Sequence, residues 1–427
     1  MTYEEARAFV DETRKYGSIL GLTSIRNLMK RLGDVQDQLK VVHVAGTNGK
    51  GSTCTMIASI LTEAGYKVGR YSSPAVFTYE EIYQINGEAI LPEDYAEAAC
   101  KVSRACSAMV ESGQPHPTSF EIETAIAFLY FADKGCDIVV LETGMGGATD
   151  ATNVVKKPVC SVLASISMDH MGFLGDTLGK IASVKAGIIK ENCPVVTVRQ
   201  KDEAMVVIRE YAQERNSSLI IADSMKAENV TYDDKQLCFD YCELSEIRLG
   251  LTGSFQLENA ILAIEAIHQL SVNGYEVNET DIRNGLRNAQ WPGRFETISE
   301  NPHIIIDGAH NEDAARKLKE TIENCFTNRP ITYIIGVLAD KEHEKILKLL
   351  LPYARKVYTV TPDNPRAFGG DKLCAEAKKF HPDVQNEKST ALAVEHAVSG
   401  AMEHEVILAF GSLSYLSQVK DAVSNWN

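Results

Sequence analysis

Hydrophobic residues follow two different spacings along the chain, and the two spacings alternate. Short, mostly apolar runs occupy residues 41–45, 137–141 and 159–167. Runs of this length are typical of buried strands. Between them, apolar residues recur every three or four positions, as Met56, Ile57, Ile60 and Leu61 do, and this is the spacing of a helix with one buried face. Strands that alternate with helices predict an α/β fold built on a parallel sheet.

The alternation restarts at residue 303 and continues to the C-terminus. Four apolar runs, HIIID, ITYIIGV, KVYTVTP and EVILAF, are separated there by segments with helical spacing. They predict a second, doubly wound parallel sheet. We place the boundary in the segment Trp291–Glu296, so that residues 1–294 form the first domain and residues 295–427 the second.

Two segments of the first domain do not fit this alternation. Residues 230–241 alternate around a polar centre, Asp233–Lys235, and predict an antiparallel hairpin. Residues 75–90 contain the turn signal Asn86-Gly87. We expect a loop or hairpin there, and it is a candidate lid over a ligand site.

Length and composition narrow the class of protein. The chain has 427 residues, of which 44% are hydrophobic and 24% charged, as expected for a soluble globular protein of two or three domains. A formal net charge of −15 argues against a nucleic-acid partner, because there is no basic excess to bind the phosphate backbone. No apolar run approaches the roughly 20 residues of a membrane span. The acidic, amphipathic N-terminus lacks the features of a signal peptide. We therefore expect a cytoplasmic monomer that acts on small molecules, with its ten cysteines as reduced thiols.

A glycine-rich segment, Gly46–Thr53, follows the first buried strand and precedes a helix. Strand, glycine-rich turn and helix in this order surround one point with backbone N–H groups and the positive end of a helix, which suits a triphosphate. We expect Lys50 to contact the β- and γ-phosphates and a hydroxyl of the loop to face Mg²⁺. The strict P-loop pattern is not met, because Val44 takes its first glycine position and Gly51 separates Lys50 from Ser52. A purely structural glycine-rich loop is the alternative.

Polar residues stand where several predicted strands end. Ser73 follows the strand 67–72, Glu142 ends the strand 137–141, and His170 follows the strand 159–167. If these strands are parallel, their carboxyl ends meet at one edge of the sheet, where ligands bind. The set predicts a metal site. The alternatives are a solvated loop glutamate, a structural histidine and, for Lys185 on the helix 177–190, an ordinary surface lysine.

Several motifs, in order along nearly the whole chain, resemble those of the folylpolyglutamate synthases and dihydrofolate synthases, a branch of the Mur ligase superfamily. The matching stretches are GTNGKGST, YSSP, T-x-FE-x-x-TA, E-x-G-x-GG followed by DATN, the DH at residue 169, KAGIIK, PGRFE, DGAHN and GxLADK. The resemblance implies a P-loop ATPase domain of the Mur ligase type and a smaller, Rossmann-like C-terminal domain.

The resemblance also assigns roles to individual residues. It implies magnesium ligands at Ser73, Glu142 and His170, and a CO₂-carboxylated lysine at Lys185. With Lys50, the residues His170 and Lys185 make up the expected catalytic set. The expected ATP contacts are Thr47, Asn48, Gly49, Lys50, Gly51, Ser52, Asn259, Arg294, Asp307, at the ribose, and His310, whose role is not assigned. The expected contacts near the pterin are Thr118, Ser119, Phe120, Glu121, Thr149, Asp150 and Ala151.

The chain departs from the family pattern at three places near the pterin side. Ala75 and Ile82 stand where the family commonly has the histidine of SPH and the arginine of NERI, and Ala148 replaces an arginine of many members. A fourth departure, Ser414-Tyr415, breaks a GSLYL pattern near the C-terminus. None of these positions belongs to the ATP and metal set.

The resemblance implies an ATP-dependent amide ligase that adds L-glutamate to a folate, dihydropteroate or both through an acyl phosphate. Such an enzyme serves folate biosynthesis and one-carbon metabolism. One alternative is a peptidoglycan Mur ligase, which shares the loop and the domain order, although the T-x-FE and DATN stretches favour the folate branch. A second is a regulatory protein that binds ATP without ligation. The motifs leave the acceptor and the number of glutamates open.

Overall fold

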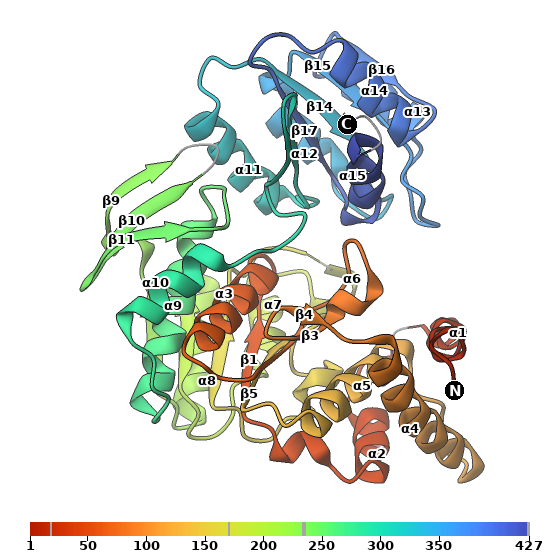
Figure 1. The fold of residues 1–427 in the computed structure, drawn as a ribbon, viewed down its shortest axis with the longest axis vertical. Helices are drawn as coiled ribbons and strands as arrows, with labels where there is room; N and C mark the ends of the chain where they lie inside the picture. Colours follow the sequence, from red (N-terminus) through yellow and green to blue (C-terminus); the bar gives the residue numbers. More distant parts are fainter. Residues whose placement is uncertain (18, 170, 233–235, 425–427) are drawn as a thin grey trace. The chain divides into compact units, whose positions relative to one another are not determined.

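The chain folds into two compact units, each with its own parallel sheet (Figure 1). The computed structural model describes residues 1–17, 19–169, 171–232 and 236–424. The N-terminal unit comprises Met1–Ala227 and Glu258–Ala289, and the C-terminal unit comprises Glu228–Leu257 and Gln290–Asn427. The predicted boundary at residues 294 and 295 stays a prediction.

An eight-stranded sheet forms the centre of the N-terminal unit, with the strand order β4-β3-β2-β5-β1-β6-β7-β8. Six of these strands run parallel, from β2 to β8, and the hairpin of β3 and β4 extends the sheet antiparallel to β2. The strands are β1 Val41–Ala45, β2 Val68–Tyr71, β3 Tyr83–Ile85, β4 Glu88–Ala89, β5 Ile138–Glu142, β6 Cys160–Leu163, β7 Val195–Val198 and β8 Leu219–Ala222. The parallel arrangement brings the ends of β1, β2, β5 and β6 to one edge, as predicted.

Helices cover this sheet on both faces (Figure 1). Two apolar clusters form beside it, one with residues of α1, α2, α4 and α5 and one with residues of α7 and α8. The helices are α1 Tyr3–Thr13, α2 Thr23–Arg31, α3 Lys50–Glu63, α4 Pro92–Glu111, α5 Ser119–Asp133, α6 Met171–Leu174, α7 Leu178–Ala186, α8 Asp202–Glu214, α9 Gln256–Val272 and α10 Glu279–Asn288. Short 3₁₀ turns include η3 Tyr79–Ile82 and η4 Ala151–Val154.

A small three-stranded sheet, β11-β10-β9, belongs to the C-terminal unit. It consists of β9 Ala227–Tyr232, β10 Leu237–Tyr241 and β11 Leu244–Leu249. The segment after it is tied to the rest of the unit, because Ser254 N donates to Thr321 Oγ1 at 3.0 Å and Thr252 Oγ1 donates to Phe295 O at 2.7 Å. The predicted hairpin is present, β11 was not predicted, and the polar centre Asp233–Lys235 lies outside the described residues.

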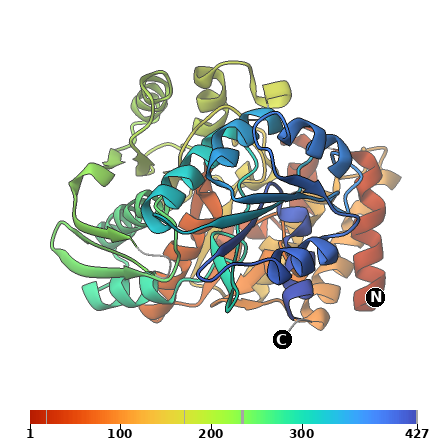
Figure 2. The same cartoon turned by 90° about the horizontal axis from the view of Figure 1, so that it is seen from above.

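A six-stranded sheet with the order β12-β13-β17-β14-β15-β16 forms the centre of the C-terminal unit. Its strands are parallel except β12, which pairs antiparallel with β13. Helices α11, α12 and α13 cover one face and α14 and α15 the other (Figure 2). The elements are β12 Glu296–Glu300, β13 His303–Ile306, α11 Glu312–Cys325, β14 Ile331–Ile335, α12 His343–Leu350, β15 Lys356–Thr359, α13 Gly370–Ala377, β16 Val384–Asn386, α14 Thr390–Ser399, β17 Val406–Phe410 and α15 Leu416–Ser424.

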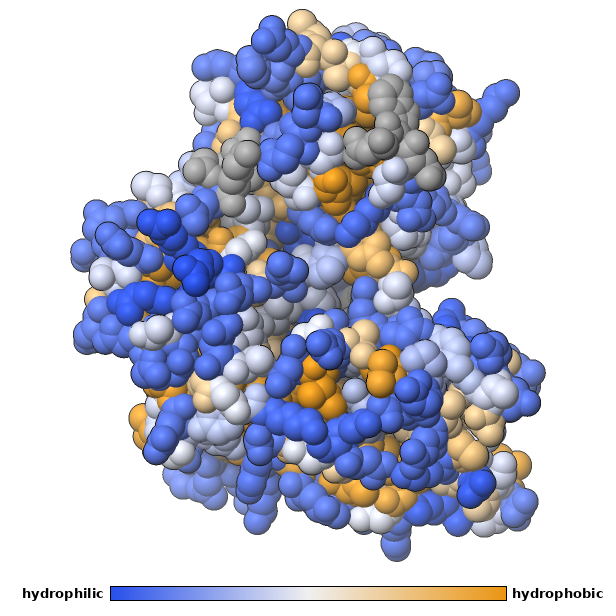
Figure 3. Space-filling view, in the orientation of Figure 1, coloured by the Kyte–Doolittle hydropathy of each residue, from blue (hydrophilic) through white to orange (hydrophobic). Residues whose placement is uncertain are grey.

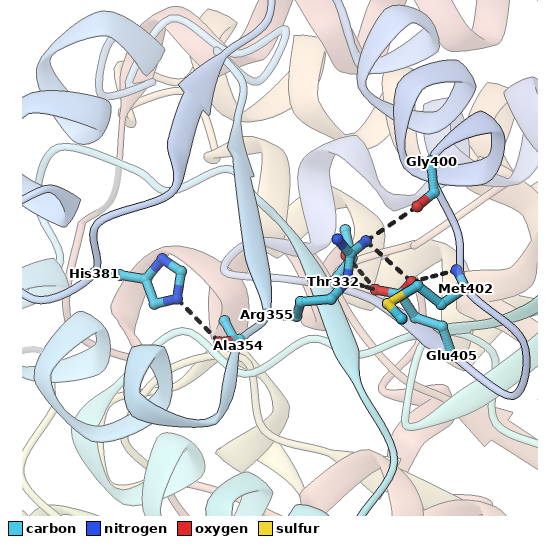
Figure 4. A network of polar contacts seen from close by, with 7 residues as sticks. All are labelled: Thr332, Ala354, Arg355, His381, Gly400, Met402 and Glu405. Atoms are coloured by element: carbon cyan, nitrogen blue, oxygen red, sulfur yellow. Dashed lines mark hydrogen bonds and ion pairs between the residues drawn. The ribbon is translucent and has the colours of Figure 1, made fainter.

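An ion pair between Arg355 and Glu405 lies at the edge of this sheet at which β14, β15 and β17 begin (Figure 4). Arg355 donates from Nε and Nη2 to the two oxygens of Glu405, at 2.8 and 3.0 Å. Thr332 Oγ1 donates to the same carboxylate at 2.6 Å, and the backbone N–H of Met402 donates at 2.7 Å. The Glu405 side chain is fully buried, so each of its oxygens has exchanged water for protein donors.

The surface carries mostly hydrophilic residues, with small and separate hydrophobic patches in the view of Figure 3. Within the described part of the chain, no helix is both long enough and apolar enough to span a membrane. All ten cysteines are free thiols.

Candidate active site

The loop that follows β1 is fixed by hydrogen bonds to the segment after β6. The N–H groups of Thr47 and Asn48 donate to Ser165 O at 2.7 and 3.2 Å. Thr47 Oγ1 donates to Ser167 O at 3.1 Å and accepts from the N–H of Ser167 at 3.1 Å. Hydrogen bonds to the segment after β6 therefore fix the start of the glycine-rich loop, and α3 begins at Lys50.

Two glycines of this loop occupy positions that a side chain would not fit. Gly49 has a φ of 87° and stands at the N-cap of α3. A side chain there would strike Oδ1 of Asn259, in the first turn of α9. Gly46 has a φ of 157°, and a Cβ atom there would approach Ala164 Cβ to 2.8 Å. The structure thus brings Asn259 against the predicted phosphate loop, although 210 residues separate it from Gly49 in the sequence.

Two lysines converge on the carbonyl oxygen of Gly46. Lys185 Nζ donates to it at 2.8 Å, and Lys50 Nζ donates to it at 3.2 Å and to Thr47 O at 3.1 Å. Burial, together with the charge of Lys50, lowers the pKa of Lys185 to about 7. Lys185 is 4% exposed, so the alternative of an ordinary surface lysine is wrong. Both cations lie where a polyanion would relieve their repulsion.

Oxygen donors gather beside this loop where β2 and β5 end. Glu142 closes β5 and is buried, Ser72 follows β2 and is buried, and Ser73 is half-buried. Ser72 Oγ has no hydrogen-bond partner among the described residues. A search of these residues for three His, Cys, Asp or Glu that could hold a metal finds none. The predicted set differs from that pattern, because it counts a serine and a lysine, and its histidine, His170, lies outside the described residues.

The capping box predicted at the start of α5 is present. The N–H of Glu121 donates to Thr118 Oγ1 at 3.3 Å, and Glu121 Oε2 accepts from Thr118 N and Thr118 Oγ1 at 2.8 and 2.9 Å. Ser24 Oγ of α2 donates to the same oxygen at 3.2 Å. Ser119 opens the helix, and the ring of Phe120 lies against Gly144 in the loop after β5. Thr118 and Glu121 thus order the helix start that presents Phe120.

The DATN stretch forms a second part of the same region. The N–H of Gly21 donates to Thr149 O at 3.4 Å, which brings the loop before α2 to this stretch. Asp150 caps η4, which begins at Ala151, and its oxygens accept from Thr152 N, Thr152 Oγ1 and Met145 N at 3.0, 2.6 and 2.8 Å. Thr152 Oγ1 is 2.9 Å from Nε2 of His43 on β1. The Asp150 carboxylate therefore holds its own loop in place.

Three predicted residues of the C-terminal unit lie close together: Arg294 precedes β12, and Asp307 and His310 follow β13. Asp307 is buried and accepts from the N–H groups of Phe295 and Ala309 at 2.9 and 2.8 Å. Burial raises the pKa of Asp307, and the charge of Arg294 opposes this shift. The guanidinium of Arg294 lies against Gly308, whose carbonyl oxygen is 2.8 Å from Nδ1 of His310. Arg294, Asp307 and His310 therefore belong to one local group.

The departures from the family pattern lie in packed surroundings. Ile82 is 4% exposed and belongs to the same apolar cluster as Tyr83. The hairpin predicted within residues 75–90 is thus confirmed, and its strands join the sheet, so this half of the segment is no lid. Ala75 packs on the edge of that cluster, and the N–H of Ala148 donates to Val184 O at 2.7 Å.

One charged residue of this region was missed by the sequence analysis. Arg70 lies in β2, is 5% exposed, and donates from Nη1 to Thr55 Oγ1 of α3 at 3.0 Å and from Nη2 to Gln84 of β3. No motif contains it. The signal that could have found it is an arginine inside a strand that has strands on both sides, since charged residues are almost never fully buried unless paired.

Comparisons with known proteins agree with this arrangement. The family models for the Mur ligase middle domain and the Mur ligase glutamate ligase domain match residues 44–267 and 293–413. The chain is 36% identical over 430 residues to a dihydrofolate synthase/folylpolyglutamate synthase of Bacillus subtilis, covering 98% of each chain. It is 33% identical over 409 residues to the Escherichia coli enzyme of the same name, covering 95% of this chain and 91% of that one.

Solved structures resemble it over the whole length. A Mycobacterium tuberculosis folylpolyglutamate synthase complexed with ADP and AMPPCP superposes with a TM-score of 0.90 at 28% identity, covering 99% of this chain and 98% of that one. Escherichia coli FolC in complex with DHPP and ADP has a TM-score of 0.86 at 30% identity, with coverage of 99% and 98%. The predicted fold class is confirmed. These likenesses show that the chain belongs to the folylpolyglutamate synthase and dihydrofolate synthase family of the Mur ligases and is an ATP-dependent carbon–nitrogen ligase.

Proposed function

We propose that the protein joins L-glutamate to the carboxylate of a folate-type acid, with tetrahydrofolate and dihydropteroate as the two candidate acceptors. The γ-phosphoryl group of ATP passes to an oxygen of the acceptor carboxylate, and ADP leaves. The amine nitrogen of glutamate then attacks the carbonyl carbon of the acyl phosphate, loses a proton, and expels phosphate as the amide forms. ATP is needed because a carboxylate does not form an amide with an amine in water unless it is activated.

The observation that carries the proposal is the pair of lysines at the loop after β1. Lys50 and Lys185 both donate to the carbonyl oxygen of Gly46, at 3.2 and 2.8 Å, and the loop ends in the N-terminus of α3. Phosphoryl transfer asks mainly for positioning and charge neutralisation, and a polyphosphate at this point would meet the Lys50 cation and a row of N–H groups. Thr47, Asn48, Gly51 and Ser52 would line the same cradle, with Asn259 beside it. Arg294, Asp307 and His310 are proposed as further nucleotide contacts.

The residues beside the loop fit Mg²⁺. The buried carboxylate of Glu142 and the buried hydroxyl of Ser72, which lacks a partner among the described residues, are oxygen donors of the kind this ion prefers. We propose that Glu142 and Ser73 hold the ion together with His170. When bound, the ion neutralises charge on the phosphates.

Lys185 is proposed to carry a carboxyl group derived from CO₂. CO₂ reacts with the neutral amine, and a pKa of about 7 leaves much of the Lys185 amine neutral at physiological pH. The product is an anion, so it would convert the repulsion between Lys50 and Lys185 into attraction and add an oxygen ligand.

On the substrate side, we propose that the pterin lies near Phe120 and Thr149. Phe120, in the first turn of α5, lies against Gly144 of the loop that carries Thr149, and the N–H of Gly21 donates to Thr149 O. Ser119 and Ala151 belong to the same two segments, whereas Thr118, Glu121 and Asp150 act by holding them. Relatives named for both activities, dihydrofolate synthase and folylpolyglutamate synthase, support both acceptors, and they favour the folate branch over a peptidoglycan Mur ligase. We propose that the enzyme works as a monomer in the cytoplasm.

The proposal is tested by incubating the purified protein with ATP, Mg²⁺, L-glutamate and either dihydropteroate or tetrahydrofolate. Mass spectrometry should show a product heavier by one glutamyl residue, and ADP and phosphate should appear in equal amounts with it. A set of products that differ by successive glutamyl residues gives the chain length. Nucleotide hydrolysis without a new amide on either acceptor contradicts the proposal, and a product with one acceptor alone settles the specificity.

A further inference from the structure

Arg70 is a buried cation that neither the motifs nor the proposed reaction uses. Its side chain runs from β2 to two neighbours, Thr55 of α3 and Gln84 of β3. At 5% exposure it has lost almost all of its contact with water. Burying a charge is costly unless another charge compensates it, so the surroundings of this guanidinium should contain a carboxylate.

Strand pairing shows which carboxylate this is. Arg70 is paired with Val140 of β5, and Glu142 stands two residues further along the same strand, hence on the same face of the sheet. The hydrogen bond from Arg70 to Thr55 identifies that face as the one covered by α3. Arg70 and Glu142 therefore share the space beneath the helix that begins at the phosphate loop.

The electrostatics of the region agree with this geometry. Burial lowers the pKa of Arg70 to about 10, and interactions with Cys54, Glu142 and Glu81 oppose the shift. Burial and the charge of Glu142 raise the pKa of Cys54 in α3, whereas the charges of Arg70 and Lys50 oppose this shift. Cys54 therefore lies near enough to the carboxylate of Glu142 and to the cations Arg70 and Lys50 for all three to affect its pKa.

We propose that Arg70 is the resident counter-ion of Glu142 and makes divalent-metal binding at this carboxylate depend on the nucleotide. This inference rests on the proposed function, in which Glu142 is a metal ligand. In the absence of nucleotide, the positive charge of Arg70 lies near the carboxylate and repels a divalent cation. When the polyphosphate is bound, its negative charge outweighs that of Arg70, and the metal binds together with the nucleotide.

The test measures binding of Mn²⁺ alone, by the electron paramagnetic resonance signal of the free ion at pH 8. Replacing Arg70 by Met keeps much of the volume and removes the charge. We expect Arg70→Met to tighten the Mn²⁺ dissociation constant by about tenfold or more, since unit charges at these separations in a protein interact strongly. With AMPPCP present, the difference between Arg70→Met and the wild type should shrink. An unchanged or weaker affinity of Arg70→Met for Mn²⁺ alone overturns the proposal.

Three further variants keep the result interpretable. Arg70→Lys retains the cation and should bind Mn²⁺ as the wild type does, whereas Arg70→Gln removes the charge, keeps a hydrogen-bonding group, and should behave as Arg70→Met even if the Met variant folds poorly. Arg209→Met removes the same charge from an exposed position of α8 and should change nothing. If Arg70→Lys tightens Mn²⁺ binding as much as Arg70→Met does, charge is not the cause and the proposal fails.

The metal site itself is tested separately with Glu142→Gln. Loss of Mn²⁺ binding in this variant supports Glu142 as the ligand. If Glu142→Gln binds Mn²⁺ as the wild type does, the metal assignment in the proposed function fails. If it loses Mn²⁺ while Arg70→Met leaves the affinity unchanged, the role of Arg70 alone fails.

Discussion

The two units bury charged side chains under opposite conditions. In the C-terminal unit, Glu405 receives hydrogen bonds from Arg355, Thr332 and the backbone of Met402, and the pair is neutral as a whole. In the N-terminal unit, Lys50 and Lys185 crowd one carbonyl oxygen with like charges. A buried charge that is paired with an opposite charge and hydrogen-bonded is compatible with a stable fold. Like charges held close together lower the stability unless a bound ligand of opposite charge compensates them. The contrast separates a structural network from a binding site without any knowledge of the ligand.

The positions of the two groups in their sheets strengthen this contrast. The Arg355–Glu405 pair lies where β14, β15 and β17 begin, and the lysines lie where β1 ends. In open parallel sheets ligands bind beyond the carboxyl ends of the strands. The crowded lysines therefore lie at the carboxyl edge of their sheet, and the paired charges of Arg355 and Glu405 lie at the opposite edge of theirs.

The sharpest test of the comparison removes Lys50. We expect Lys50→Ala to lower turnover by about 10² to 10³, since it withdraws a charge that stabilises the transferring phosphoryl group. In protein prepared without CO₂, in which Lys185 is an unmodified amine, the melting temperature should stay the same or rise, because the repulsion on Lys185 is gone. Steady-state kinetics and differential scanning calorimetry measure the two effects. Normal turnover would remove Lys50 from phosphate binding, and a large fall in melting temperature would show that the two lysines are not in conflict.

Replacing Lys185 should also impair catalysis, in a way that small molecules can repair. Lys185→Ala is expected to lose about a hundredfold in turnover, the lower end of the range for a single electrostatic contact, and to regain part of it with acetate or propionate, which supply the missing carboxylate. Lys180→Ala is a matched control, because Lys180 lies on the same helix with a side chain 64% exposed; it should behave as the wild type with or without these acids. No rescue, with an unmodified lysine by mass spectrometry of the intact protein, contradicts carboxylation.

In the C-terminal unit the comparison predicts the reverse pattern: a substitution in the Arg355–Glu405 pair should lower the stability and leave turnover nearly unchanged. Glu405→Gln should lower the free energy of unfolding by about 2 to 3 kcal/mol, somewhat less than for a fully buried pair, because the Arg355 side chain is 32% exposed. Turnover at 25 °C should stay within about twofold of the wild type, the size of a change under 1 kcal/mol.

Two variants serve as controls for that prediction, with chemical denaturation as the measurement. Glu312→Gln breaks the partly exposed pairs with Arg316 and Lys345 and should cost about 1 kcal/mol or less. Arg355→Met combined with Glu405→Gln should recover part of the loss, because no unpaired charge remains. A strong loss of turnover in the folded Glu405→Gln protein would place this network in the active site instead.

The smallest expected effect concerns His43, which is buried beside Thr152 in the sheet of the N-terminal unit. Burial, helped by the charge of Lys190, lowers the pKa of His43 from 6.5 to about 3. Between these values the unfolded chain takes up a proton that the folded protein does not. Stability is therefore lost as the pH falls below 6.5, by about 1.4 kcal/mol at pH 5.5 from this group alone.

This contribution is isolated by comparing urea unfolding at pH 7.5 and 5.5. His43→Gln should lose about 1.4 kcal/mol less than the wild type over this interval, whatever its stability at pH 7.5. His404→Gln, at a side chain 82% exposed, should show the wild-type loss. An equal loss in His43→Gln and the wild type would mean that His43 is protonated in the folded protein.

Periodicity and motifs predict the elements whose residues are buried on a regular face. The strand 41–45 agrees with the structure to the residue, and the strand 137–141 is observed one residue later, at Ile138–Glu142. The strands that were not predicted, β11, β12 and β16, have polar residues at alternate positions or only three residues. Their pairing depends on a neighbour that is distant in the chain or on the edge of a sheet, and local pattern does not contain that information.

The candidate site likewise has features that the sequence predicts and features that it does not. Motifs locate Gly46–Thr53 and Glu142 because backbone geometry and ligand chemistry restrict the residue types there. They do not show that Lys50 and Lys185 share one carbonyl oxygen, since 135 residues separate the two lysines. Nor do they show that the oxygens of Asp150 are engaged by its own loop, or that Arg70 is buried, because both facts depend on how separate segments pack.

The way the chain passes between its units has a consequence for how it is made. The polypeptide leaves the N-terminal unit after Ala227, returns at Glu258, and leaves again after Ala289. During synthesis on the ribosome, the first unit cannot acquire its last helices until about two thirds of the chain has emerged. Residues 290–427 expressed alone would also lack β10, β11 and Phe255, which packs against their core. Cutting the chain at any single point between the two units should therefore leave each fragment without part of its own unit.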